Sequence, residues 1–267
     1  MSSLLRSKRK SSTGYYVASA VIGVAMVAAV AYVFYARSTR EPDINAVTFC
    51  PADGPRGHIL VLVDRSDPMA FTQRKAFSVA YREIVRQVPK GHLLSVYALS
   101  DDFKATAGPL LELCNPGDGS DVKEFDDNPA LRKRVFEQKY LQPFLAREEE
   151  LVTDRSGKAS PILEMVQLAA ITGFRKQHVT GEKRLVIVSD MIQNTPELNM
   201  YKGVPDYAVF SKTPYGVKAR ADLQDVKVEL RMLMNTPSIQ TEQLLDFWKN
   251  HMRQGGGRLV LHDPING

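Results

Sequence analysis

One short stretch, residues 58–69 (HILVLVDRSDPM), constrains the fold of this chain most strongly. It is apolar over residues 59–63 and then changes to the polar sequence DRSDP. A short, continuous apolar run bounded by turn residues is typical of a strand that is buried on both faces, as in a parallel sheet. Ligands of open α/β sheets collect outside the carboxyl ends of such strands, so Asp64 and Ser66 lie where a functional site is expected.

A second buried strand of the same kind covers residues 185–188 and ends in Ser189 and Asp190. Other apolar runs predict strands at 93–99, 110–114, 226–234 and 258–262, and apolar residues at helical spacing predict helices at 68–87, 129–152 (divided near Pro143), 161–176 and 241–254. We expect Asp67 to cap the first of these helices, with Pro68 at its first position. Strands that alternate with helices predict an α/β fold, a doubly wound, mostly parallel sheet with helices on both faces, over residues 58–267.

The amino-terminal part of the chain differs in character from this domain, because residues 15–36 carry no charge and are mostly apolar. About 20 apolar residues at 1.5 Å each cross the ~30 Å hydrocarbon core of a bilayer, so this segment predicts one transmembrane helix, followed by a linker at 37–57. A cleaved signal peptide is the alternative, but its apolar region is usually shorter. Self-association of the helix is a further expectation, based on small residues at four-residue spacing: Ser19, Gly23, Ala25 and Ala29.

Positive charge gathers before this span, in a basic tail at residues 1–14. Four of the 35 Lys and Arg residues precede the span, and none of the 30 Asp and Glu residues do. The positive-inside rule therefore places the tail in the cytoplasm and the domain on the other side of the inner (plasma) membrane, in the periplasm or its equivalent. The rest of the chain is nearly neutral, so no nucleic acid is expected as a partner.

Cys50 and Cys114 are the two cysteines of the chain. Outside the cytoplasm, such a pair is expected to form one disulfide. If the topology were reversed, two buried free thiols would be the better interpretation, because cytosolic thiols stay reduced. The absence of an Asn-X-Ser/Thr glycosylation sequence agrees with a bacterial source.

Three segments together resemble a known family. The first strand ends in D-R-S-D-P, residues 157–162 read G-K-A-S-P-I, and residues 185–190 read L-V-I-V-S-D. This pattern is similar to that of von Willebrand factor A domains, in which D-x-S-x-S, a Thr or Ser before a helix, and an Asp after the fourth strand form a metal-ion-dependent adhesion site. The resemblance covers roughly residues 55–263 and implies four metal ligands: Asp64, Ser66, Ser160 and Asp190. Pro68 stands where the family has its second serine, so one hydroxyl of the motif is absent.

The resemblance implies a protein-binding module, not an enzyme, that belongs to an envelope or membrane-associated assembly, with Mg²⁺ as the candidate cofactor. Four residues beside the predicted ligands are the candidates for partner binding: Asp67, Tyr201, Tyr207 and Phe210. Two alternatives stay open. The acids and hydroxyls can simply hydrogen-bond turn amides and one another, and the aromatic residues of 201–215 can pack down on their own surface.

An enzyme is the second functional hypothesis. Two carboxylates at the strand ends would suit a metal-dependent hydrolase or nuclease, which would need further acids at the same edge. Asp101 and Asp102, after the second predicted strand, are the candidates. A structural scaffold without a metal is the third hypothesis.

Overall fold

The structure is a computed structural model that describes residues 13–38, 43–99, 108–121, 128–153, 157, 159–175, 179 and 181–267. The chain divides into two units, Met1–Asp43 and Ile44–Gly267. Helix α1 (Thr13–Ser38) belongs to the first unit. Its segment Tyr15–Tyr35 is long and apolar enough to span a membrane, in agreement with the predicted transmembrane helix.

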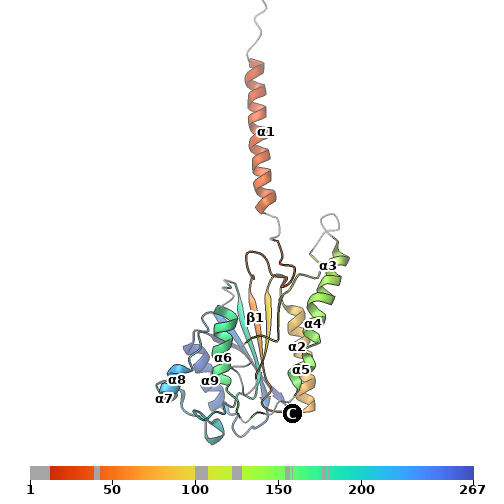
Figure 1. The fold of residues 1–267 in the computed structure, drawn as a ribbon. Helices are drawn as coiled ribbons and strands as arrows, with labels where there is room; N and C mark the ends of the chain where they lie inside the picture. The colour runs from red at the N-terminus through yellow and green to blue at the C-terminus, as the bar shows by residue number, and fades with distance from the viewer. Residues whose placement is uncertain are drawn as a thin grey trace, which may run out of the picture. The chain divides into compact units, whose positions relative to one another are not determined.

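The second unit contains a six-stranded, mostly parallel sheet (Figure 1). Its strands lie in the order β3-β2-β1-β4-β5-β6, and only β3 runs antiparallel, as a hairpin partner of β2. Their bounds are β1 His58–Asp64, β2 Leu93–Leu99, β3 Leu111–Cys114, β4 Lys183–Ser189, β5 Val226–Met234 and β6 Arg258–Asn266. The central strands β1 and β4 are the two strands that end in acids, and they are direct parallel neighbours.

Helices cover both faces of the sheet, as the sequence predicts. One face packs against α2 (Phe71–Gln87), η1 (Phe136–Leu141), α4 (Gln142–Leu145) and α5 (Glu148–Val152). Helix α3 (Pro129–Val135), which leads into η1, has no buried residue. The other face packs against α6 (Ile162–Leu168), η2 (Ala169–Arg175), η3 (Met200–Lys202), α7 (Tyr207–Phe210), α8 (Pro214–Lys218) and α9 (Glu242–Gln254). Figure 1 shows the two groups on opposite sides of β1. Because successive side chains of a strand alternate between faces, β1 sends Leu60 and Leu62 into one core and Val61 and Val63 into the other.

The predicted start of the first helix is wrong. Helix α2 begins at Phe71, its N-cap is Ala70, and the side chain of Gln73 accepts a hydrogen bond from the Ala70 N–H at 2.8 Å. Asp67 is therefore not a helix cap, and it stays in the loop that follows β1. Phe71 and Leu131 belong to the apolar residues at helical spacing that predict the helices at 68–87 and 129–152 and would place them in the core, but they are 78% and 55% exposed.

Residues 44–57, which the sequence predicts as linker, belong to the second unit. A disulfide joins Cys50 to Cys114 at the end of β3, as predicted. The Cys114 N–H also donates to the Thr48 carbonyl at 2.8 Å, and the Arg56 N–H donates to the Gly91 carbonyl at 3.0 Å. The chain therefore enters this unit at the amino end of β1, where the preceding segment is held covalently.

Breaking this covalent link should destabilise the second unit. Replacing Cys50 by Ser is expected to lower the free energy of unfolding by about 2–4 kcal/mol, because the unfolded chain regains the freedom of the loop that the bond closes. Urea unfolding followed by the fluorescence of the buried Trp248 measures the change. Cys114→Ser and reduced wild-type protein should match Cys50→Ser. Equal stability of the oxidised wild type and the variants would show that the bond contributes nothing.

Candidate functional site

The carboxyl ends of β1 and β4 bring polar side chains together at one edge of the sheet. Asp64 is the last residue of β1 and Ser189 the last residue of β4, and the two strands pair in parallel up to Val63 and Val188. The Ser189 hydroxyl donates a hydrogen bond to Asp64 Oδ2 at 2.8 Å. Together with Ser66, Ser160 and Asp190, these residues form what we call the acid cluster; all five are buried.

Asp64 is the centre of the acid cluster. Its Oδ1 accepts hydrogen bonds from the Ser66 N–H at 2.9 Å and from the Ser66 hydroxyl at 2.6 Å. Its Oδ2 accepts from the Ser160 hydroxyl at 3.2 Å and from Ser189. Four neutral donors, one N–H and three hydroxyls, therefore satisfy both oxygens of this buried side chain.

Ser160 reaches the acid cluster from a third chain segment. It lies just before α6, and its backbone pairs with Asn194 through two hydrogen bonds of 2.9 and 3.0 Å. Its hydroxyl oxygen lies 3.0 Å from that of Ser66. The structure thus brings together all four predicted metal ligands: Asp64, Ser66, Ser160 and Asp190.

Asp190 is bound much less completely than Asp64. Its Oδ1 accepts a hydrogen bond from the Ile192 N–H at 2.9 Å, but its Oδ2 is buried and has no hydrogen-bond partner within the described part of the chain. Burial, and next the negative charge of Asp64, raise the pKa of Asp190 to about 8, and Asp67 adds to the rise through its charge and through a side-chain hydrogen bond that favours the protonated form of Asp190. Once this side chain loses its proton, it is a buried carboxylate close to two others, Asp64 and Asp67, and a cation would then compensate its charge.

The turn after β4 holds Asp190 in this unfavourable position. Met191 has a φ of 62°, in the left-handed region that non-glycine residues rarely adopt. The Trp248 indole N–H donates to the Met191 carbonyl at 2.8 Å, and the Gln240 side chain donates to the Asp190 carbonyl at 2.9 Å. Strained backbone that the surrounding structure maintains tends to occur at functional sites.

The acid cluster fits a hard cation of the Mg²⁺ type. Two carboxylates and two hydroxyls are oxygen donors that such an ion accepts, usually together with several waters. A cation would also satisfy Asp190 Oδ2 and relieve the repulsion between the two carboxylates. No set of three or more His, Cys, Asp or Glu residues that could hold a metal occurs in the described ranges.

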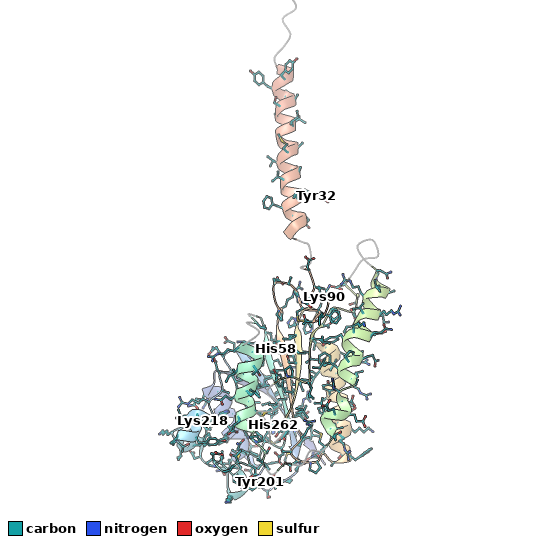
Figure 2. The ribbon with its side chains drawn as sticks, viewed as in Figure 1. Tyr32, His58, Lys90, Tyr201, Lys218 and His262 are labelled. Atoms are coloured by element: carbon teal, nitrogen blue, oxygen red, sulfur yellow. A yellow bond between two sulfur atoms is a disulfide. The ribbon has the colours of Figure 1, made fainter. Side chains whose placement is uncertain are left out.

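Tyr201 lies close to the acid cluster, whereas Tyr207 and Phe210 do not. Partial burial and the negative charges of Asp190, Asp67 and Asp64 raise the pKa of Tyr201 to about 12, so its phenol remains a hydrogen-bond donor. Tyr201 is 44% exposed. Figure 2 shows Tyr201 at the lower end of the second unit, below His58, the first residue of β1.

Tyr207 and Phe210 pack against α9. The Phe210 ring lies 5.0 Å from that of Phe247 and is buried, and the Tyr207 ring meets Phe247 edge-on at 5.2 Å. This is the arrangement in which the aromatic residues of the 201–215 segment pack down on their own surface. Asp67 is half-buried in the loop after β1, beside Asp190. Asp101 and Asp102 lie outside the described residues.

Two contributors are not among the predicted site residues, although the sequence places Ser189 at the same strand end as Asp190. Ser189 precedes Asp190 and donates to Asp64, a role that the position of a hydroxyl at the last residue of a strand beside β1 could have indicated. Gln240 lies in the loop before α9 and joins the Asp190 and Leu233 carbonyls. Nothing in the local sequence marks Gln240, since its role depends on how α9 packs.

Comparison with known proteins finds no matching family model and no matching curated protein. Among solved structures, the chain is similar to the conserved hypothetical protein BatB from Bacteroides thetaiotaomicron. The sequences are 9% identical, the TM-score is 0.36, and the match covers 80% of this chain and 91% of that chain.

The charge on Asp190 should make the folded state less stable as the pH rises. The pKa of Asp190 is raised from 3.8 to about 8 in the folded state. Between these pH values the folded chain holds one more proton than the unfolded chain, so the free energy of unfolding decreases as the pH increases. In EDTA, Asp190→Asn should therefore raise Tm more at pH 8 than at pH 5, by roughly 2–4 °C for each kcal/mol gained.

Comparing variant and wild type at each pH isolates this effect. Burial lowers the pKa of His58 and His251 to about 4. These two residues have the opposite pH dependence: they destabilise the folded state as the pH falls below 6.5, the pKa of a free histidine. Asp246→Asn, which removes an exposed carboxylate of α9, is the matched control and should leave Tm unchanged at both pH values. A gain for Asp190→Asn that is no larger at pH 8 would contradict the assignment.

Proposed function

We propose that this chain is a membrane-anchored protein-binding module and that a partner protein docks at the acid cluster. The observation that carries the proposal is Asp190 Oδ2, a buried oxygen that accepts no hydrogen bond from an N–H or O–H group of the described residues and lies close to the carboxyl groups of Asp64 and Asp67. A fold gains no stability from such a group, so its upkeep by a strained turn is better explained by binding than by packing.

Mg²⁺ is the proposed cofactor of this edge, as the resemblance to von Willebrand factor A domains implies. The carboxylates of Asp64 and Asp190 and the hydroxyls of Ser66 and Ser160 would hold it. When bound, the ion would supply positive charge, and a carboxylate of the partner could complete its set of ligands. Around it, the Tyr201 phenol and the half-buried Asp67 would offer the partner a hydrogen-bond donor and an acceptor.

The proposed location is a cytoplasmic membrane, with the second unit on the extracytoplasmic, periplasmic side. Helix α1 is suited to span a membrane, and the basic residues before it favour a cytoplasmic amino terminus. The disulfide between Cys50 and Cys114 supports an oxidising compartment. The chain enters the second unit at the amino end of β1, and the acid cluster lies at its carboxyl end, about 20 Å away for a seven-residue strand. This separation suits a module that presents its binding edge to another member of a membrane-associated assembly.

Metal binding can be tested on the full chain in detergent micelles. Titration with Mg²⁺ and Mn²⁺ should raise the Tm of the wild type at pH 8 and release or absorb heat, because an ion that binds only the folded state stabilises it. Asp64→Ala and Ser160→Ala should abolish both signals, and Asp246→Asn should keep them. If millimolar Mg²⁺ or Mn²⁺ produces neither a heat signal nor a Tm shift, the proposed metal site is contradicted.

Partner binding needs a separate measurement. Proteins that co-purify with the wild-type chain from solubilised membranes should be lost with Asp64→Ala and retained with Asp246→Asn. If the same proteins remain with Asp64→Ala, with and without metal, the acid cluster is not the docking edge.

Orientation can be tested with an enzyme reporter fused after Gly267. A reporter that is active only outside the cytoplasm should be active in this fusion, because the tail before α1 is basic. Activity of a cytoplasm-only reporter at the same position would contradict both the topology and the expected oxidation of Cys50 and Cys114.

A further inference from the structure

A cavity of about 650 Å³ lies beside the acid cluster. Its walls include three prolines from separate chain segments, Pro161, Pro196 and Pro214, and the side chain of Tyr215. Proline has a fixed φ and adds little side-chain freedom, so these walls are stiff and largely apolar. A cavity with stiff walls can bind a side chain without the entropic cost of ordering its own residues first.

The backbone pair between Ser160 and Asn194 separates this cavity from the acid cluster. The Ser160 hydroxyl binds Asp64, whereas its chain neighbours Ala159 and Pro161 line the cavity. On the opposite segment, Thr195 follows Asn194 and also lines the cavity. A protein that docks on the acid cluster therefore has the cavity within reach of a neighbouring side chain.

The cavity carries negative charge that no cation in the described structure neutralises through an ion pair. Glu164 accepts hydrogen bonds from the Tyr215 hydroxyl at 2.6 Å and from the Gln193 side chain at 3.0 Å, both neutral donors. Burial and the charges of Glu164 and Glu197 raise the pKa of Tyr215, which keeps its hydroxyl protonated as the donor. Glu197 is exposed at the rim, and Lys218 is the one cationic residue of the lining.

We propose that this cavity receives an arginine side chain from the protein that docks on the acid cluster, so the inference rests on the proposed function. A guanidinium is planar, can stack on the Tyr215 ring and can form paired hydrogen bonds with carboxylates such as Glu164 and Glu197. An anionic side chain would be repelled by the two glutamates. An apolar side chain would bury the Glu164 charge without compensating it.

Nα-acetyl-arginine amide is the probe for this inference, with Nα-acetyl-citrulline amide as its neutral analogue of the same shape. Binding to the full chain in detergent micelles is followed by NMR of ¹³C-labelled tyrosine rings. The arginine probe should shift the Tyr215 ring signals, assigned with Tyr215→Phe, and saturate. The citrulline probe should bind about fivefold more weakly, as the loss of ~1 kcal/mol predicts.

Two variants locate the site. Glu197→Gln removes an exposed charge without touching the fold, and Glu164→Gln preserves the shape of the Tyr215 contact; each should weaken the arginine probe by about two- to fivefold. Glu242→Gln, an exposed glutamate in the first turn of α9, is the control and should change nothing. Absence of saturation, equal binding of the citrulline probe, or an unchanged affinity in Glu197→Gln would each overturn the inference.

The result can be separated from that of the proposed function. Asp190→Asn alters the acid cluster but not the cavity lining, so arginine-probe binding should persist in this variant while the Mg²⁺ response is lost. Conversely, Glu197→Gln should keep the Mg²⁺ response. Loss of the arginine probe in Asp190→Asn would show that the probe binds at the acid cluster and would overturn the cavity assignment.

Discussion

The carboxylate of Asp64 holds together three segments that are distant in the sequence. Through Ser66, Ser160 and Ser189 it joins the loop after β1, the loop before α6 and the end of β4. A buried charge is costly unless its hydrogen bonds are made, and here one carboxylate accepts four of them. The loss of one hydroxyl would leave the charge less well compensated, so the geometry of this whole edge depends on the complete set.

Asp190 stands in contrast to Asp64 only one strand away. Asp64 accepts four hydrogen bonds, whereas Asp190 has a raised pKa, a left-handed residue directly after it and one oxygen that no N–H or O–H group of the described residues reaches. The two neighbouring acids therefore differ in role: the hydrogen bonds of Asp64 organise the edge, and in our proposal Asp190 is the group that a ligand would satisfy. The same edge continues through the Ser160 and Asn194 pair into a cavity with negative charge of its own, so cationic groups suit both halves of the surface.

The sequence allowed the sheet and the acid cluster to be predicted because both follow from short-range patterns. The apolar runs of β1 and β4 identify strands buried on both faces, and parallel strands bring their carboxyl ends to one edge, which places Asp64 near Asp190. The start of α2 was not predictable in this way, since the side chain of Gln73 and not Asp67 caps its first turn. Tyr207 and Phe210 pack against α9, a contact between segments about forty residues apart that no local pattern encodes.

The entry of the chain at one end of β1 and the acid cluster at its other end have a mechanical consequence. Tension between the anchored end and a protein held at the acid cluster would run along β1. The hydrogen bonds of β1 to β2 and β4 would then share the load in shear and would have to break at the same time. The bond between Cys50 and Cys114 would pass part of that load directly to β3. If the proposed anchor and partner are present, the second unit would transmit force between them through strands loaded in shear, without separating one hydrogen bond at a time.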